Sequence, residues 1–526
     1  MLSLKLFSED KVDKLLTPGI VFDQICTMVG LGPKDPPSRK GSMHDVPKDL
    51  MDQIKILEDL FSVDTQKLNF ITERFTKELA KGLSKEGGSI VSFRRCNPVG
   101  SIDLLDFPNQ PMNPTWVLSN PTGHETGTYL ALDMGGTNLR VCEIELPEEP
   151  GKFDIMQSKY RMPSAIKTGT AEDLFDYVAD CLKQFLISNH EDQNMKEMSL
   201  GFTFSYPCTQ EFIDHGVLQR WTKGFDVQGV EGKDVVPLFE AALAKKGVPI
   251  KVTALINDTT GTLVASNYTD QTTKIGCIFG TGCNAAYFEL AGNIPKLEHM
   301  NLPPDMPIAI NCEWGAFDNE HYVLPRTVYD AQIDEQSPRP GQQAFEKMIA
   351  GYYLGEILRL TLLDLAERRD VEIFAGQKLT ALQKPYSLDA SFLAEIESDP
   401  WENLGETEIL FEKRLGIQTT EPERKLIRRL AELIGTRAAR LSACGIAAIV
   451  RKRDLSPCSV GADGSVFNKY PHFRERNAAA LREILGHDDV IVKPAEDGSG
   501  VGAALIAALT NQRIKDGILA GISKVE

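Results

Sequence analysis

The sequence predicts an α/β fold built from two lobes, and three observations support this prediction. At 526 residues the chain is longer than a single hydrophobic core usually supports. From Gly127 onward, apolar or alternating runs typical of strands alternate with helical patterns. Two similar strand–turn–strand units, one around Asp133 and one around Gly280, indicate a duplication with the two turns facing each other across a cleft.

Composition shifts along the chain predict its division into segments. Apolar residues at Leu50, Ile54 and Leu57 follow the spacing of a helix, and the Pro- and Asn-rich stretch 98–121 marks a junction. The basic residues just before Ser42 are typical of a regulatory phosphorylation site in a flexible arm, and the alternative is a plain linker with basic residues by chance. The predicted segments are an N-terminal extension and arm (1–45), a helical segment packed on the large lobe (46–120), a small lobe (121–257) that takes back a C-terminal helix (503–526), and a large lobe (258–502).

Composition and charge exclude several classes of function. A hydrophobic content of 42% and a charged content of 25% are those of an ordinary globular protein. The net charge of −17 argues against nucleic acid and anionic membrane as partners. The mixed charges near the N-terminus lead us to expect neither a secretory signal nor a mitochondrial presequence, and without a run of 18 apolar residues we expect no membrane span. Ten scattered cysteines without a Cys-x-x-Cys pair favour a cytoplasmic protein, and the eight histidines show no metal-ligand spacing.

The segment from Tyr129 to Ile144 is the most informative part of the chain. It reads as a strand, a polar turn containing Gly135 and Gly136, and a second strand. Glycines let a phosphate approach the backbone N–H groups, and the side chains of Thr137 and Asn138 add donors. Asp133 ends the first strand, where a carboxylate can hold Mg²⁺ through water. The alternative is an ordinary hairpin with a Gly-Gly turn.

A second turn of the same kind and a candidate acid–base residue follow later. The segment from Lys274 to Glu289 again runs from a strand into a Gly280-Thr281-Gly282 turn and out into a strand. Asp258 ends the buried strand that begins near Val252, a position that overhangs a cleft in α/β proteins. The alternative is that Asp258 merely caps the following helix.

Three further polar residues are candidates for the site. Ser205 follows the strand that begins at Leu200, and Glu313 and Glu346 each stand beside apolar residues. A buried glutamate needs hydrogen-bond partners, and vicinal sugar hydroxyls supply them. The alternative for any single glutamate is a place on the surface.

The first turn resembles the first phosphate loop of the actin and sugar-kinase ATPases. Longer motifs resemble the consecutive signatures of the eukaryotic hexokinases, in family order from about Val46 to the end. They are Leu200 to Gln210, Leu218 to Phe225, Ile256 to Gly261, Gly280 to Asn284, Glu313, Glu346 and Gly461 to Lys469. The stretches Arg220 to Phe225 and Ser337 to Gln343 are most similar to the fungal branch. The loop containing Cys208-Thr209 departs slightly from the commoner pattern.

The resemblance implies a fold, an activity and a set of site residues. The fold would be that of a two-lobed actin-like ATPase, a duplicated ribonuclease H-like fold with a deep cleft between the lobes. The activity would be ATP- and Mg²⁺-dependent phosphorylation of glucose, and also of fructose and mannose, at the 6-hydroxyl, the first step of glycolysis. Asp258 would be the general base. The residues that would hold the sugar are Ser205, Thr222, Lys223, Asn257, Asp258, Asn284, Glu313 and Glu346. The residues that would hold the nucleotide are Asp133, Gly135, Gly136, Thr137, Asn138, Lys159, Gly280, Thr281, Gly282, Gly461, Asp463, Gly464, Ser465 and Gly498.

Two other classes remain open at this point. A hexose-binding regulator without catalysis would keep the sugar residues but not need Asp258 together with both phosphate loops. An actin- or chaperone-like ATPase switch would keep the loops but not need Ser205, Glu313 or Glu346. The monomer and the homodimer are both compatible with the sequence. Arg140 is interpreted as a structural residue of the outgoing strand.

Overall fold

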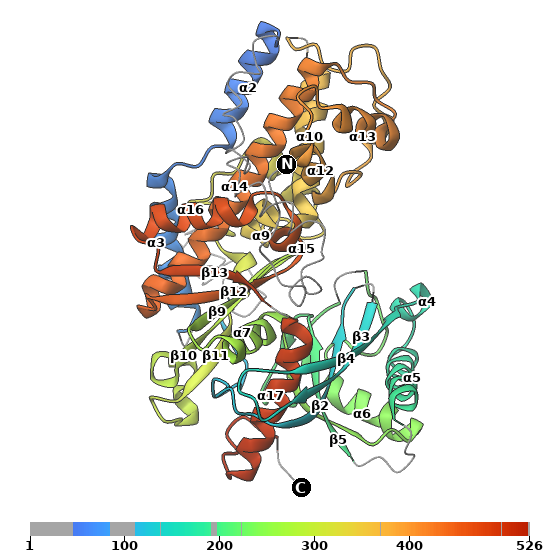
Figure 1. Ribbon diagram of the computed structural model, residues 1–526, viewed down its shortest axis with the longest axis vertical. Helices are drawn as coiled ribbons and strands as arrows, with labels where there is room; N and C mark the ends of the chain where they lie inside the picture. The colour runs from blue at the N-terminus through green and yellow to red at the C-terminus, as the bar shows by residue number, and fades with distance from the viewer. Residues whose placement is uncertain are drawn as a thin grey trace, which may run out of the picture.

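A computed structural model shows two lobes, each built on one β-sheet (Figure 1). The structure describes residues 46–84, 111–136, 138–190, 197–221, 224–368, 370–495 and 497–523. The predicted arm 1–45 with Ser42 lies outside these residues, as do the predicted site residues Thr137, Thr222 and Lys223.

The small lobe contains a five-stranded sheet in the order β4-β3-β2-β5-β8. The strands are β2 (Gly127–Met134), β3 (Asn138–Leu146), β4 (Asp154–Arg161), β5 (Met198–Phe204) and β8 (Ile250–Ile256). The strands β2, β3 and β4 form an antiparallel meander, and β5 and β8 continue the sheet in parallel with β2. Helices α5 (Ala171–Asn189) and α6 (Val235–Lys246) pack against this sheet and share its hydrophobic core.

The large lobe contains a six-stranded sheet in the order β1-β11-β10-β9-β12-β13. The strands are β1 (Asn113–Pro114), β9 (Thr273–Phe279), β10 (Cys283–Leu290), β11 (Pro307–Asn311), β12 (Cys458–Asp463) and β13 (Val490–Pro494). Here β9, β10 and β11 form the antiparallel meander, and β12 and β13 run parallel to β9. The small-lobe sheet has the same arrangement, so the predicted duplicated, two-lobed actin-like fold is confirmed.

Two helices lie between the sheets and cross each other closely (Figure 1). Helix α7 (Asp258–Thr269) packs on β9, β10 and β12, whereas α17 (Gly498–Lys515) packs on β2, β5 and β8. At the crossing, a Cβ on Gly502 would lie 2.1 Å from the carbonyl oxygen of Gly261, so a side chain there would push the helices apart. Helix α17 corresponds to the predicted helix 503–526, but it begins at Gly498 and ends at Lys515.

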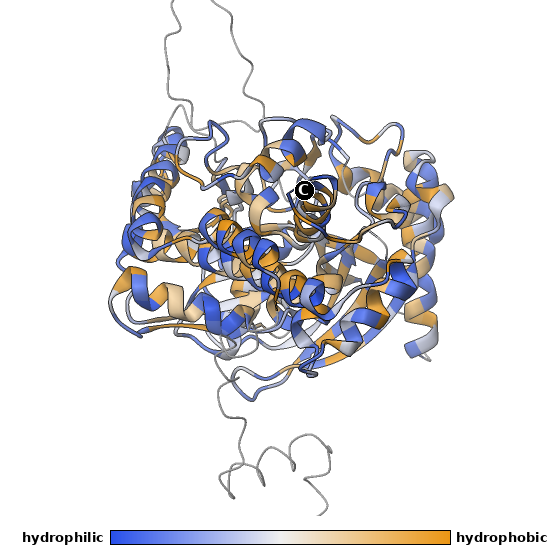
Figure 2. Ribbon diagram, turned by 90° about the horizontal axis from the view of Figure 1, so that it is seen from above, coloured by the Kyte–Doolittle hydropathy of each residue, from blue (hydrophilic) through white to orange (hydrophobic). Residues whose placement is uncertain are grey.

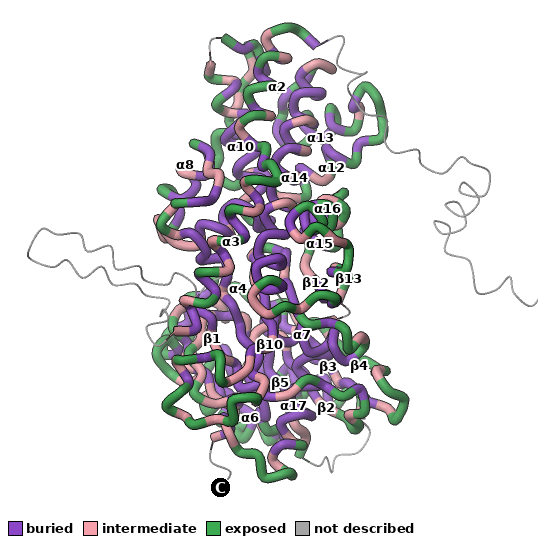
Figure 3. The backbone as a smooth tube through the Cα atoms, turned by 90° about the vertical axis from the view of Figure 1, so that its left-hand side faces the viewer, coloured by how far each residue is buried: buried purple, intermediate pink, exposed green. Residues whose placement is uncertain are grey.

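The long helix α14 (Glu421–Arg453) forms the centre of the large lobe's helical part (Figure 3). Helices α2 (Lys48–Phe61) and α3 (Thr65–Gly82) pack on it through their apolar faces. Among the described residues α14 alone is long and apolar enough to cross a membrane, but 89% of its apolar window is buried inside the protein, as in a core helix.

The remaining helices cover the two sheets or extend the helical part of the large lobe. Figure 2 shows that many of the helices carry hydrophilic and hydrophobic residues interleaved, as amphipathic helices do. The helices are α4 (Ser164–Lys167), α8 (Val328–Gln336), α9 (Ala344–Ile349), α10 (Gly351–Glu367), α11 (Thr380–Gln383), α12 (Ala390–Ser398), α13 (Gly405–Leu415), α15 (Ser465–Lys469) and α16 (Phe473–Leu485). A short hairpin, β6 (Cys208–Thr209) with β7 (Val217–Leu218), follows β5.

Candidate active site

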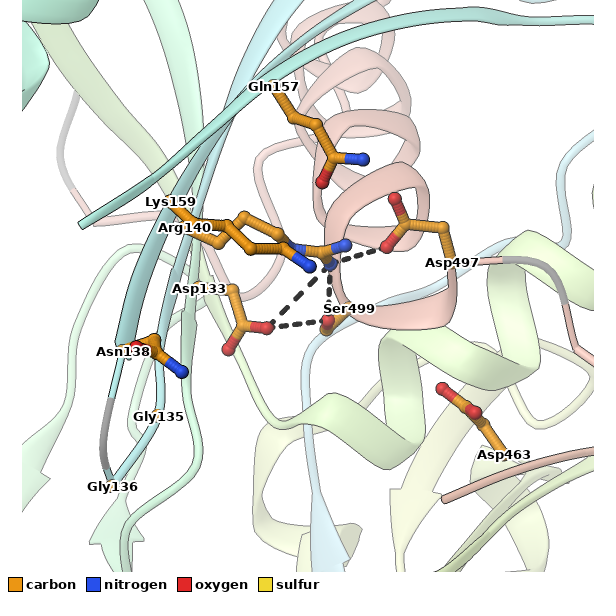
Figure 4. A pocket seen from close by; sticks show the side chains of 10 residues that line it. All are labelled: Asp133, Gly135, Gly136, Asn138, Arg140, Gln157, Lys159, Asp463, Asp497 and Ser499. Carbon is orange, nitrogen blue, oxygen red and sulfur yellow. Dashed lines mark hydrogen bonds and ion pairs between the residues drawn. The ribbon is translucent and has the colours of Figure 1, made fainter. Parts of the chain in front are cut away.

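A pocket of about 640 Å³ lies where the two lobes meet (Figure 4). Its lining combines the predicted first phosphate loop with Lys159 of β4 and with Asp463 of the large lobe. Ser499, which adjoins the predicted Gly498 in the segment expected near the adenosine, also lines it. Three further lining residues were not predicted to belong to the site: Arg140, Gln157 and Asp497.

The first loop is a tight turn between β2 and β3. The Gly135 N–H donates to the Asn138 carbonyl over 3.1 Å, which closes the turn. A Cβ on Gly135 would lie 3.3 Å from that same oxygen, so a larger residue would strain the turn. The loop therefore presents backbone rather than side chains to the pocket at Gly135 and Gly136.

A polar network joins this loop to the first turn of α17. The Arg140 guanidinium bonds the Asp497 carboxylate, donates to Ser499 Oγ over 2.8 Å, and lies 3.7 Å from Asp133 Oδ2. Ser499 in turn donates to Asp133 Oδ2 over 2.7 Å. Figure 4 shows these four side chains converging on one side of the pocket. Arg140, interpreted from the sequence as a structural residue of the outgoing strand, is therefore also a lining residue of the pocket.

The second loop joins β9 to β10 and packs against the start of α15. The Gly280 N–H donates to the Gly282 carbonyl over 2.9 Å, and the Gly280 carbonyl accepts from the first N–H of α10. Gly464 has a φ of 112°, and a Cβ there would lie 2.4 Å from the carbonyl oxygen of Phe279. Only glycine allows these two backbone segments to approach so closely.

The residues predicted to lie near the adenosine come from three elements of the structure. Gly461 and Asp463 belong to β12, and Ser465 begins α15. Gly498 begins α17, and a Cβ on it would lie 2.4 Å from Thr262 Oγ1 of α7. Of these residues Asp463 lines the pocket itself.

Three neighbouring parallel strands bring predicted residues to one edge of the small-lobe sheet. Asp133 lies near the C-terminal end of β2, Ser205 follows β5, and Asn257 and Asp258 follow β8. The register pairs Asp133 with Thr203 and Thr203 with Ile256, so the three strands end together. Ligands of open α/β sheets bind outside this carboxyl edge.

Asp258 and Asn257 have different parts in the helix that follows. Asn257 is the N-cap of α7, and its Oδ1 accepts from the Thr259 N–H over 2.9 Å. Asp258 is the first residue of the helix, and its Oδ1 accepts from Thr259 Oγ1 over 3.2 Å. The alternative that Asp258 serves as the cap is therefore wrong, because its neighbour fills that position.

The predicted large-lobe sugar residues adjoin one another beside the second loop. Asn284 Nδ2 donates to Asn311 Oδ1 over 2.6 Å and to Glu313 Oε1 over 3.2 Å. Asn311 Nδ2 also donates to Glu313 Oε1, over 2.9 Å, so Asn311 belongs to this cluster although the sequence reading passed over it. Glu346 Oε2 accepts from the Cys283 N–H over 2.9 Å.

Two cysteines adjoin the predicted sugar residues. Burial, together with the carboxylates of Asp234 and Glu313, raises the pKa of the Cys208 thiol. Burial and the charge of Glu346 likewise raise the pKa of Cys283 well above its ordinary value. Both cysteines therefore stay neutral thiols beside the cluster.

The described cysteines and acidic residues offer no metal centre held by the protein alone. All eight described cysteines are free, and no group of three or more His, Cys, Asp or Glu side chains in the described part of the chain is placed to bind a metal.

Comparisons with known proteins agree with this geometry. Two family models described as hexokinase match residues 53–268 and 274–509. A hexokinase of Emericella nidulans is 63% identical over 500 residues, covering 94% of this chain and 98% of that protein. Hexokinase-1 of Saccharomyces cerevisiae is 52% identical over 505 residues, covering 94% of this chain and 99% of that protein. A solved hexokinase from Schistosoma mansoni, complexed with glucose, has a TM-score of 0.77 and 34% identity, covering 88% of this chain and 99% of that one. The chain belongs to the hexokinase family, in its fungal branch, and is an enzyme that phosphorylates hexoses with ATP in glycolysis.

Proposed function

We propose that Asp258 is the general base in the phosphorylation of the 6-hydroxyl of glucose, fructose and mannose. The observation that supports this proposal is that β2, β5 and β8 end together, with Asp133 near the end of β2, Ser205 after β5 and Asp258 after β8. Thr259 holds one oxygen of the Asp258 carboxylate, and the second oxygen takes the proton from the hydroxyl. The sugar oxygen then bonds the terminal phosphorus of ATP, the bond from that phosphorus to ADP breaks, and ADP leaves with the bond's electrons.

The sugar is held from both lobes in this proposal. Ser205 and Asn257 contribute from the small lobe, together with Thr222 and Lys223, which lie outside the described residues. Asn284, Glu313 and Glu346 contribute from the large lobe, and Asn311 holds Asn284 and Glu313 in a fixed relation. A sugar that lacks one of the matching hydroxyls leaves a buried polar group unpaired, at a cost of about 1–3 kcal/mol.

ATP is held by the two glycine loops, with Asp133 to Asn138 on one side and Gly280 to Gly282 on the other. Lys159 and Arg140 line the pocket and offer positive charge to the phosphates. Gly461, Asp463, Gly464, Ser465 and Gly498 contribute from the strand and helix ends around the adenosine.

The residues of the pocket also fit Mg²⁺. The carboxylates of Asp133, Asp463 and Asp497 line it, and oxygen ligands with several retained waters are what Mg²⁺ prefers. We propose that Asp133 holds the ion through water. When bound, the ion supplies positive charge that neutralises the charge developing on the phosphates.

The remaining proposals concern organisation. We divide the chain into the arm 1–45, a segment 46–120 packed on the large lobe, a small lobe of 121–257 with 503–526, and a large lobe of 258–502. The enzyme acts in the cytoplasm, as a monomer or a homodimer, with neither a nucleic acid nor a membrane as its partner.

A coupled assay that measures ADP release tests the proposed reaction. We expect rapid release with glucose, fructose or mannose and Mg-ATP, little release without sugar, and a phosphate on the sugar's 6-oxygen by NMR. Rapid ADP release without any sugar would support an ATPase switch instead. Sugar binding by calorimetry without any turnover would support a regulator.

A further inference from the structure

The buried carboxylate of Asp334 binds the side chain of Lys347, the residue that follows Glu346. Asp334, near the end of α8, is 7% exposed and accepts from Lys347 Nζ over 2.6 Å. Its two oxygens also accept from the Gly341 N–H, each over 3.1 Å. Arg326 Nη2 and His321 Nε2 approach the same carboxylate at 3.4 and 3.7 Å.

Lys347 is the matching buried cation. It is 4% exposed, and besides Asp334 it donates to Ser337 Oγ and to the Arg339 carbonyl, each over 2.9 Å. All three donor positions of its ammonium group are thus used inside the protein. The pair therefore ties α8 and the loop 337–343 to α9, the short helix that carries Glu346.

A neighbouring face of α9 contacts the sugar cluster. Glu346, next to Lys347, accepts from the Cys283 N–H, and a Cβ on Gly282 would lie 2.7 Å from Glu346 Oε2. A Cβ on Gly315 would lie 3.1 Å from Glu346 Cβ. Glu346 is therefore confined between two glycines, while its neighbour is anchored by Asp334.

The loop 337–343 reaches the second glutamate as well. Gln343 adopts a φ of 57° as the N-cap of α9, and its Oε1 would lie 2.4 Å from a Cβ on Gly315. Gly315 follows Glu313 by two residues, so the segments that carry the two glutamates touch each other at this point. A movement of the loop is transmitted to both.

We propose that the buried Asp334–Lys347 pair is a positioning device that sets how tightly the sugar is held, by fixing Glu346 and the loop 337–343. This inference rests on the proposed role of Glu346 in sugar binding. The pair does not touch the sugar. Helix α9 has only six residues, and the side chain of its N-cap residue makes no capping hydrogen bond. The pair holds this short helix in a single orientation.

The physical reason lies in the desolvation of the pair. A buried ion pair favours one conformation because either charge left alone inside the protein raises the free energy. Positions of α9 that separate Asp334 from Lys347 are therefore disfavoured. Without the pair, Glu346 samples positions in which its oxygens no longer face the sugar. Affinity for the sugar then falls, while Asp258 and the first phosphate loop, which belong to the other side of the cleft, are unaffected.

The test uses isosteric variants of both partners. For Asp334→Asn and Lys347→Met we expect the KM for glucose to rise by at least about tenfold, with kcat within about threefold. The KM for ATP should rise much less, because Glu346 touches only the end of the second phosphate loop. Ser337→Ala removes one bond to Lys347 and provides a milder variant, expected to raise the KM for glucose about two- to threefold. Lys347→Arg keeps the charge and should recover most of the affinity.

A matched control lies one helical turn away on the same helix. Asp330, four residues before Asp334, forms an even more deeply buried pair with Arg437 of α14, at 2.6 and 2.8 Å. Asp330→Asn should lower the melting temperature as much as Asp334→Asn but leave the KM for glucose unchanged. If both variants change the KM for glucose equally, or if Ser337→Ala and Lys347→Met leave it unchanged, the positioning proposal is overturned.

A double-mutant cycle separates this proposal from the role of Glu346. If Glu346 binds the sugar and the pair positions it, the KM increases of Glu346→Gln and Lys347→Met should combine to much less than their product. A full product would overturn the proposal while leaving the sugar role of Glu346 intact. An unchanged KM for glucose in Glu346→Gln alone would instead overturn the sugar role itself.

Discussion

Ser499 Oγ donates a 2.7 Å hydrogen bond to Asp133 Oδ2, joining the first turn of α17 to the end of β2. These residues are 366 positions apart in the chain. The Ser499 carbonyl also accepts from Thr203 Oγ1 of β5 over 2.7 Å. The start of α17 is thereby fastened to two strands of the small lobe at the very edge where the nucleotide pocket opens.

Replacement of Asp258 tests the proposed base. Asp258→Asn keeps the shape of the side chain but cannot accept the proton, and removing a general base typically costs about 10²–10⁴-fold in rate. We expect that loss in kcat at saturating glucose, with glucose binding by calorimetry within a few-fold of the wild type. Retention of more than about a tenth of the wild-type kcat would assign the base to another residue.

Replacement of Arg140 tests its place in the nucleotide pocket. Charge-assisted hydrogen bonds contribute about 1.5–3 kcal/mol, so Arg140→Met should raise the KM for ATP roughly 10- to 100-fold. The KM for glucose should stay unchanged, because Arg140 lines the pocket on the nucleotide side. Arg482→Met is a suitable control, since Arg482 of α16 is exposed and paired with Asp488, which follows that helix. Equal KM values for ATP in both variants would contradict the assignment.

Glucose should draw the lobes together and stabilise the protein. The proposed sugar ligands come from both lobes, so a bound sugar bridges the two lobes and the closed arrangement gains contacts. At 100 Kd of glucose, binding to the folded state alone adds about 2.7 kcal/mol of stability. The measurements are the melting temperature and the radius of gyration by X-ray scattering, with L-glucose as the control. Mg-ATP alone should change both much less, and an unchanged radius at saturating glucose would count against closure.

Glu78 should make stability depend on pH. Burial raises the pKa of this carboxyl on α3 to about 7, although Arg74 lies 3.3 Å away. The folded protein therefore holds the proton over a range in which the unfolded chain has lost it. The protonated Glu78 therefore contributes its full stability below about pH 4.5. The free energy of unfolding falls by roughly 1–3 kcal/mol as the pH rises through about 7.

The neutral variant Glu78→Gln isolates this effect. Its melting temperature relative to the wild type should increase as the pH is raised from 5 to 8. Glu73→Gln, one turn earlier on the exposed side of α3, should show no such increase. Parallel curves for Glu78→Gln and the wild type would mean that Glu78 is ionised throughout.

The fold could be predicted from the sequence because its signals are local. Each strand–turn–strand unit can be recognised within about sixteen consecutive residues. The repetition of this unit predicted the duplicated architecture, which the two sheets confirm. The residues of the first loop reach the pocket lining together because one tight turn holds them.

The residues that the sequence reading passed over are defined by distant partners. Arg140 lines the pocket because Asp497, 357 positions later, lies opposite it. Asn311 belongs to the sugar cluster because it accepts a hydrogen bond from Asn284. Lys347 can be buried because it pairs with Asp334. Strand alternation offered one usable signal: Gln157 stands two residues before Lys159 on β4 and therefore shares its face.

The glycine crossing of α7 and α17 has a consequence for the interpretation of variants. The spacing between the lobes is set there by backbone against backbone at Gly261, Gly498 and Gly502, with no room for a methyl group. A substitution such as Gly502→Ala would act as a wedge behind the cleft and change the resting angle between the lobes. Sugar affinity would then change although every atom that meets the sugar is the same, so an altered KM in a natural variant is not by itself a sign of contact with the substrate.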